Sequence, residues 1–390
     1  MVNTYEFSAP FNGNPQLIAS STDKKKDLKP ETTTSTDIGA ELQLLQRRVR
    51  FDISLYNSNS YDKILGVNVS PTTGFRSKIL NAGKINNKGV EIQLGITPVK
   101  NIFTWDINLN YAANRSKVIE LDKEGLLQNY VIGSNSAQVI ASVGQPYGTL
   151  FGSAFLRNAS GEIIVNGSGA PQTDPNQKVL GKYPADWIGG ITNTFSYKKI
   201  SLGVLVDASV GGSIYNGTYA TGTYTGVLAS TLPGRGAEFG GLSYYYPSDD
   251  KKNGTVQLTN GETAPNGEVV HTDGLIFDGV TADGKQNTKV LPAQAYYKSF
   301  RKIDEANIFD ASYVKLREIT FSYDLPKTWI RKIGLAGASV SLVGRNLLII
   351  HKNVPDIDPE TAFNNGNAQG LESLSLPTTR SYGFNINLKF

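Results

Sequence analysis

The chain has 390 residues, a formal net charge of +4 and a mean hydropathy of −0.25. No apolar run approaches the ~18 residues that a membrane-spanning helix requires, which argues against a helical membrane protein. Charges of both signs are spread along the chain without a long basic block, so nucleic acid is not an expected partner. Cysteine is absent, which excludes disulfides, whereas 40 glycines, 19 tyrosines and 16 phenylalanines favour strands, turns and aromatic belts.

Strict alternation of apolar and polar residues recurs along the chain, as in strands whose two faces meet different environments. In the clearest case, from Phe103 to Tyr111, five apolar residues alternate with four polar ones. Within 313–323 the alternation slips at Arg317 and Glu318, which predicts a β-bulge. We predict four hairpins and a lone last strand, with strands at 38–44, 49–55, 90–96, 103–111, 187–197, 202–208, 313–323, 338–350 and 380–390.

The connections between these strands alternate between short and long. The short ones are 45–47, 98–101, 198–199 and 324–337, and the long, polar ones are 61–86, 115–185, 211–307 and 351–379. A transmembrane barrel has tight periplasmic turns and long outer loops, whereas a soluble β-sandwich, the alternative, has no reason to gather its long loops at one end. The pattern therefore predicts an all-β, antiparallel transmembrane β-barrel in a bacterial outer membrane.

Aromatic residues near the ends of the predicted strands support this prediction independently. One group falls near the short turns and comprises Phe103, Trp105, Phe195, Tyr197, Phe321, Tyr323 and Phe390. A second group falls near the long loops and comprises Tyr111, Trp187 and Tyr382. Two belts are the arrangement that amphipathic rings adopt at the two interfaces of a membrane.

The last strand places a large apolar side chain at every second position: Tyr382, Phe384, Ile386, Leu388 and Phe390. This pattern suits a strand with lipid on one face and a wet lumen on the other. It also resembles the C-terminal signal that outer-membrane proteins present to the barrel-assembly machinery. We therefore predict these five residues to be an assembly signal.

Several stretches of sequence resemble blocks of TonB-dependent receptors. The stretch Asp27-Leu-Lys-Pro-Glu31, followed by Ile38-Gly-Ala-Glu41, is similar to one such block, and 81–92 resembles a block of the SusC/RagA branch. Further blocks lie at 278–284, 296–297, 310–318, 322–326, 344–347 and 358–360. Together they make nearly the whole chain, from about residue 27 onward, similar to the SusC/RagA family of TonB-linked outer-membrane proteins.

The resemblance implies a fold, an activity and partners. Members of the family are 22-stranded barrels with a plugged lumen. They import glycan oligomers or peptides across the outer membrane of Bacteroidota, and a SusD-like surface lipoprotein closes over the barrel mouth. The TonB complex pulls on an N-terminal box and displaces the plug. No catalytic residue, metal or cofactor is implied.

The chain also departs from the family pattern. It has nine predicted strands, no recognisable secretory signal in Met1 to Glu6, and neither a TonB box nor a plug domain. We therefore expect residues 1–390 to be the C-terminal part of such a receptor, with TonB acting through the missing N-terminal part. Nine strands are not expected to close, because an open sheet edge in lipid leaves backbone groups without hydrogen bonds.

Polar residues offer few alternatives to import. Five carboxylates should face the lumen, where we favour a hydrogen-bonded lattice over a polar path or plug contacts: Asp37, Glu41, Asp52, Glu91 and Asp106. Asp356, Asp358 and Glu360 have a spacing that could hold Ca²⁺, although a structural loop with a turn fixed by proline is favoured. The two histidines, His271 and His351, are expected to be surface residues rather than catalytic ones.

The long loop 211–307 is rich in aromatic residues: Tyr215, Tyr219, Tyr224, Phe239 and Tyr244-Tyr245-Tyr246. Such rings could stack on sugars, which makes Tyr244 and Tyr245 candidate substrate contacts. Packing within the loop or against a lid protein is an equal alternative.

Two other function classes compete with import. A barrel enzyme, such as an outer-membrane protease or lipase, would need converging Ser, His and Asp side chains near the barrel mouth. A surface adhesin would use the long loops to bind a host or a matrix. The strand count and the family blocks favour import over both.

Overall fold

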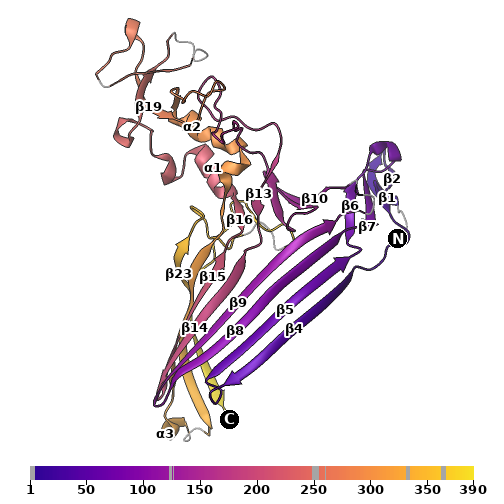
Figure 1. The fold of residues 1–390 in the computed structure, drawn as a ribbon, viewed down its shortest axis with the longest axis vertical. Helices are drawn as coiled ribbons and strands as arrows, with labels where there is room; N and C mark the ends of the chain where they lie inside the picture. Colours follow the sequence, from indigo (N-terminus) through magenta and orange to yellow (C-terminus); the bar gives the residue numbers. More distant parts are fainter. Residues whose placement is uncertain are drawn as a thin grey trace.

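The computed structural model describes residues 5–122, 125, 127–247, 254–259, 261–330, 334–361 and 366–390. Its largest element is a nine-stranded antiparallel sheet, which we call the wall (Figure 1). Its strands are β4 (Thr32–Leu44), β5 (Val49–Tyr61), β8 (Lys84–Lys100), β9 (Phe103–Glu120), β14 (Trp187–Tyr197), β15 (Ile200–Val210), β22 (Tyr313–Asp324), β23 (Gly337–Lys352) and β25 (Ser381–Lys389).

All nine predicted strands lie in the wall, and each pairs with its neighbours in the order in which the chain makes them. Several strands continue beyond the predicted ends on the side of the long connections. For example, β9 reaches Glu120 instead of Tyr111, because the more polar segment that follows still pairs with β8. We call this side the loop end and the opposite side, which holds the short turns, the turn end.

The register gives the wall an apolar face and a polar face. The apolar face carries large exposed side chains, among them Ile38 at 70% exposure and Leu342 at 61%. Asn193 lies on the same face, and its amide oxygen accepts a hydrogen bond of 3.1 Å from Trp105 Nε1. Aromatic contacts link neighbouring strands near both ends, with ring centroids 5.8 Å apart for Trp105–Phe195 and 5.6 Å for Tyr111–Trp187.

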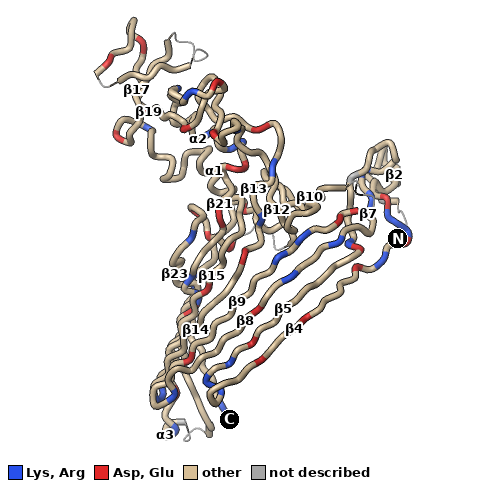
Figure 2. Tube along the Cα trace, in the orientation of Figure 1, with Lys and Arg blue, Asp and Glu red and all other residues tan. Residues whose placement is uncertain are grey.

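The five carboxylates predicted to share the lumen side do lie on one face. Glu41 is paired with Asp52, and Asp52 with Gln93, so these residues and Glu91 alternate with the apolar ones. Figure 2 shows charges of both signs along β4, β5, β8 and β9. Since the apolar side chains occupy the opposite face, a barrel made from this wall would point these charges into its lumen.

The predicted bulge at Arg317 is confirmed. Leu205 of β15 pairs with Glu318, and Val206 pairs with Leu316, so Arg317 has no pairing partner on β15. Both Arg317 and Glu318 therefore belong to the polar face, although they are adjacent in sequence. Without the extra residue, the alternation would place charged and apolar side chains of β22 on the wrong faces.

The long connections contain secondary structure of their own, which the sequence patterns did not predict. Four smaller sheets and one hairpin lie at the loop end of the wall, and the hairpin comes from the segment that precedes β4 (Figure 1). The hairpin is β1 (Tyr5–Phe11) with β2 (Asn14–Ala19), and the first sheet holds β3 (Thr22–Lys24), β6 (Ile64–Asn68) and β7 (Ser77–Asn81). The second holds β10 (Asn129–Ser134), β11 (Gln138–Ser142), β12 (Thr149–Gly152) and β13 (Lys178–Lys182).

The two remaining sheets come from the later connections. One holds β16 (Ser213–Asn216), β21 (Ile308–Asp310) and β24 (Leu371–Glu372), and the other holds β17 (Leu242–Tyr245), β18 (Val256–Gln257), β19 (His271–Ile276) and β20 (Val290–Pro292). The α-helices are α1 (Gly217–Thr225), α2 (Ala293–Ser299) and α3 (Lys327–Ile330). None of the described helices has the length and apolarity that crossing a membrane requires.

Most of the buried core lies in these connections, and the wall contributes only a few buried apolar residues, such as Val118 on β9. We call the described residues of the three connections that follow β9, β15 and β23 the loop module. One cluster joins Val139, Leu150, Tyr215 and Leu371, which come from all three connections. The loop module therefore packs as one body instead of forming three independent loops.

Candidate functional site at the loop end

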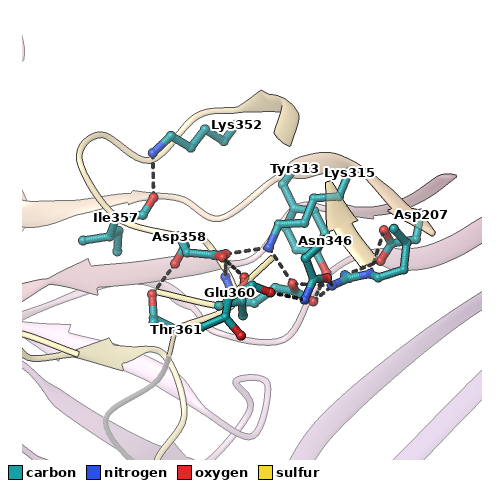
Figure 3. Close-up of polar contacts among 12 residues, drawn as sticks. Asp207, Tyr313, Lys315, Asn346, Lys352, Ile357, Asp358, Glu360 and Thr361 are labelled. Atoms are coloured by element: carbon teal, nitrogen blue, oxygen red, sulfur yellow. Dashed lines mark hydrogen bonds and ion pairs between the residues drawn. The ribbon is translucent and has the colours of Figure 1, made fainter. Parts of the chain in front are cut away.

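Two cations on β22 hold the last long connection against the polar face of the wall (Figure 3). Lys315 Nζ lies 2.5 Å from an oxygen of Asp358 and 2.5 Å from an oxygen of Glu360. The side chains of Lys315 and Asp358 are only 3% and 5% exposed. A buried charge is costly without a partner, so each of these two ions depends on the other.

Arg317 uses both edges of its guanidinium group. It makes two hydrogen bonds to Glu360, of 2.7 and 2.9 Å, and two to Asp207 on β15, of 2.6 and 3.2 Å. Forked contacts of this kind fix geometry as well as charge. Since the bulge puts Arg317 on the polar face, it is the bulge that permits this contact. We call Asp207, Lys315, Arg317, Asp358 and Glu360 the clamp.

The loop side of the clamp is a turn fixed by proline, as predicted. The amide of Thr361 donates to the carbonyl of Asp358 at 3.0 Å, with Pro359 at the second position of the turn. The Asp358 side chain also accepts from the backbone amide of Glu360 at 3.0 Å. Among the described residues, no group of three or more His, Cys, Asp or Glu side chains is arranged to hold a metal ion. Of the three carboxylates considered for Ca²⁺, Asp358 and Glu360 bind Lys315 and Arg317 instead.

The two loop carboxylates of the clamp are held in their ionised form. Burial would raise the pKa of Asp358, but hydrogen bonds from Lys315 and Thr378 lower it below its ordinary value of 3.8. Burial acts in the same direction on Glu360, and hydrogen bonds from Arg317 and Lys315 lower its pKa below 4.5. Both shifts make the clamp strongest where these carboxylates are charged.

A second buried carboxylate ties the last connection to α1. Glu372 is fully buried and accepts hydrogen bonds from the amide and the hydroxyl of Thr218, at 2.9 and 2.7 Å, in the first turn of the helix. A negative charge is favourable at this end of a helix. Asn216, the N-cap residue, bonds the amide of Tyr219 and the carbonyl of Pro355.

A third set of contacts ties the connection after β9 to the connection after β15. Asp304 is buried and accepts from the amide and the hydroxyl of Ser153, at 2.9 and 2.8 Å. Glu305 next to it pairs with Arg157, at 2.7 Å. All three connections of the loop module are therefore joined by charged side chains that make hydrogen bonds.

A cavity of about 640 Å³ lies between the wall and the loop module. Ser60 on β5 and Asn87 on β8 belong to the polar face of the wall, so the cavity opens on the lumen side. Tyr130 on β10 and Asn367 in the last connection form other parts of its lining. Gly133 lets the last connection approach β10, because a side chain there would overlap Ala368.

The two predicted substrate contacts, Tyr244 and Tyr245, differ in how far they are buried. Tyr244 is 1% exposed, its ring stacks on His271, and its hydroxyl donates to Asp273 at 3.0 Å. Burial and this hydrogen bond raise the pKa of Tyr244. Tyr244 therefore packs within the loop and presents no free ring face. Packing of this kind was the alternative to cargo contact in the sequence analysis. Tyr245 is half-buried, and its contact with cargo stays a prediction.

The structure also places the two histidines and the predicted assembly signal. His271 packs between tyrosines and is half-buried, so the expectation of a surface residue is wrong for it, whereas His351 is exposed and bonds Asn353 at 2.9 Å. The five residues of the predicted assembly signal are all exposed, and the four within β25 share the apolar face. Their recognition by assembly machinery stays a prediction.

Sequence reasoning missed the clamp as a unit, although it noted both of its parts. Lys315 and Arg317 lie in the block 310–318, and Asp358 and Glu360 form the block 358–360. Opposite charges in two such blocks were the available signal for a contact. Asp304 and Glu372 carried no signal of this kind.

The wall and its loop end are similar to parts of known proteins. A family model described as "TonB dependent receptor-like, beta-barrel" matches residues 3–347. The chain belongs to the TonB-dependent receptor β-barrel family. Receptors of this family are outer-membrane proteins, so the wall is part of a transmembrane β-barrel, with its apolar face toward lipid.

Relatives of this receptor chain include TonB-dependent receptor P3 of Formosa agariphila, 26% identical over 394 residues, which cover 93% of this chain and 34% of the relative. SusC of Bacteroides thetaiotaomicron is 25% identical over 204 residues, covering 49% of this chain and 20% of SusC. A solved structure of the RagAB peptide importer in its "closed-closed" state is similar in fold, with a TM-score of 0.67 and 18% identity, over 100% of this chain and 38% of that chain.

These matches confirm the predicted resemblance to the SusC/RagA branch. The chain spans about a third of the length of the curated receptors that match nearly all of it. This coverage fits the prediction that the nine strands are part of a larger barrel. Within the described residues, β4 and β25 each have a neighbour on one side only.

Proposed function

We propose that this chain forms the C-terminal part of the barrel of an importer driven through TonB. The importer takes up glycan oligomers or peptides across the outer membrane and works with a SusD-like surface lipoprotein. The short turns face the periplasm, and the loop module faces the medium. TonB acts through parts of the receptor outside these 390 residues, and the barrel-assembly machinery recognises the last strand.

One observation carries this proposal: the loop module is tied to the wall and to itself by buried charges. Lys315 with Asp358, Asp304 with Ser153, and Glu372 with Thr218 fix three connections in one arrangement. A fixed outer surface above a polar lumen suits a mouth that receives cargo and a lid protein. An adhesin needs no such link between its loops and a lumen, and the family consists of receptors and transporters rather than enzymes.

The test is made with the complete receptor gene in its own organism. We expect its deletion to abolish growth on one class of oligomer as sole nutrient, and deletion of tonB to have the same effect. A neighbouring gene for a SusD-like lipoprotein should be needed for the same growth. Normal uptake in the deletion strain, together with lost attachment to a surface, would support the adhesin. Substitution of Tyr245 by alanine then tests its contact with cargo, as a change in affinity.

A further inference from the structure

The cavity at the barrel mouth is built by parts of the chain that lie far apart in sequence. Its lining includes Glu31 before β4, Lys63 after β5, Asn87 on β8, Tyr147 after β11 and Asn367 in the last connection. A volume of about 640 Å³ is in the range of sites that bind small ligands. Because Asn87 lies on the same face of β8 as Glu91, the cavity lies beside the path of any cargo that enters the lumen.

Several polar groups in this cavity have no protein partner among the described residues. Within the parts of the chain that the structure describes, no protein hydrogen bond is found for the side-chain amides of Asn87 and Asn367 or the hydroxyls of Tyr130 and Tyr147. These groups are both donors and acceptors. Polar groups that converge on a cavity without satisfying one another are typical of a binding site.

The charges of the cavity cancel. Glu31 and Lys63 form an ion pair of 2.7 Å, and Glu31 also accepts from the amide of Ile64 at 3.0 Å. Since the pair leaves no net charge, the cavity favours a neutral ligand over a strongly acidic or basic one.

The apolar part of the lining is mostly aliphatic. It consists of Ile64, Leu65, Ile85, Leu121, Ile132 and Ala141. Sugar rings are held mainly against the faces of aromatic rings, whereas aliphatic pockets suit the apolar side chains of peptides. The two tyrosines supply hydroxyl groups that can bond peptide amides and carbonyls.

We propose that this cavity is a subsite for a neutral peptide segment. An apolar side chain of the peptide packs on the aliphatic residues, and its backbone bonds Asn87, Tyr130 and Tyr147. This inference rests on the proposed import function and narrows its cargo to peptides. The clamp has a positioning role, because Asp358 and Glu360 hold the connection that carries Asn367 and Ala368 to the rim.

The test uses the complete receptor purified with its surface lipoprotein. The probes are a fluorescent pool of acetylated, amidated pentapeptides with leucine, isoleucine or phenylalanine at the centre, and a fluorescent pool of neutral hexasaccharides. The test variants are Asn87→Leu and Tyr130→Phe, which remove hydrogen-bonding groups with little change in size. Asn110→Leu and Tyr224→Phe are matched controls outside the cavity.

We expect peptide affinity to fall about threefold to tenfold for each test variant, as for the loss of one hydrogen bond, and to stay unchanged in the controls. Migration of the unheated barrel in a gel checks folding in every variant. Peptide affinity that is equal in test and control variants would overturn the inference, as would affinity for the hexasaccharides alone or for neither pool. Growth that depends on the receptor gene would still stand in those cases, so failure of this inference is distinguishable from failure of the import function.

Discussion

The wall and the loop module place the same kinds of residues in opposite positions. In the wall, large apolar side chains such as Ile38 and Leu342 point outward and the polar ones point inward. In the loop module, apolar residues such as Val139 and Leu150 are fully buried, as in a water-soluble domain. The solvent that surrounds each region decides which side chains it shows.

The two regions also differ in what holds them together. Wall strands are joined by long backbone ladders between neighbours, and these ladders do not depend on particular side chains. The loop module has short ladders and relies on individual buried groups such as Asp304, Asp358 and Glu372. Single substitutions should therefore be tolerated in the wall unless they put a charged side chain on the apolar face. They should be most damaging at the buried polar groups that hold the loop module together.

The largest effect is expected from isolating the wall. When residues 1–390 are produced alone behind a signal sequence, β4 and β25 each keep an unpaired edge. Unpaired backbone groups in lipid cost several kcal/mol each, so we expect no stable insertion and no transport. Protease resistance and migration of the unheated sample in a gel measure this. A compact, heat-modifiable barrel from these residues alone would contradict it.

Next comes the clamp. We expect Lys315→Ala in the complete receptor to destabilise the last connection by about 3–5 kcal/mol, because Asp358 would stay buried without its partner. Lys285→Ala is the matched control, since its ion pair with Asp283 is largely exposed and should contribute about 0–1 kcal/mol. Hydrogen exchange of residues 353–361 is the measurement. Equal protection in both variants would show that the clamp does not hold the loop.

The two faces of the wall can be compared at adjacent positions. Val204 lies on the apolar face of β15 and Leu205 on the polar face. Arginine in place of a lipid-facing residue near the membrane midplane costs about 2–4 kcal/mol, so Val204→Arg should destabilise the barrel by that amount and Leu205→Arg by less. Unfolding of the complete receptor in urea, in lipid vesicles, provides the comparison. A larger cost for Leu205→Arg would reverse the assignment of the faces.

Acid should open the loop module before it affects the wall. Because the pKa values of Asp358 and Glu360 are lowered in the folded protein, their contribution is complete above the ordinary values of 3.8 and 4.5. It is lost as the pH falls below these values and the carboxylates take up protons. Acid-stable proteases, applied between pH 6 and pH 2, should cut the last connection only toward the acidic end. Cleavage that does not change over this range would contradict the expectation.

The smallest effect is expected at Tyr244. Tyr244→Phe removes the hydrogen bond to Asp273 and keeps the packing on His271, which should cost about 0.5–1.5 kcal/mol within the loop module. Cargo affinity should not change, because the ring is buried. Measurement of both quantities on one preparation separates packing from binding. A fall in affinity at unchanged stability would return Tyr244 to the candidate substrate contacts.

The same contrast explains what the sequence alone could reveal. Period-two alternation marked every strand of the wall, and its slip at Arg317 marked the bulge, because a transmembrane wall needs one apolar face throughout. The loop module has no such rule, so β10 to β13 and the two helices α1 and α2 gave no readable period. The ties of Lys315 to Asp358 and of Ser153 to Asp304 join residues far apart in sequence, and a single sequence contains no record of such distances.

These distances have a consequence for the order of events during biogenesis. Hairpins of the wall form between consecutive segments, but the hydrogen bonds from Ser153 to Asp304 and from Thr218 to Glu372 span 151 and 154 residues. Closing such long loops in a free chain is slow, whereas a completed wall already holds their ends together. We expect pulsed proteolysis during membrane assembly to find the strands protected first and the connections later. A receptor caught between these two stages would have its barrel in place while its mouth was still unformed.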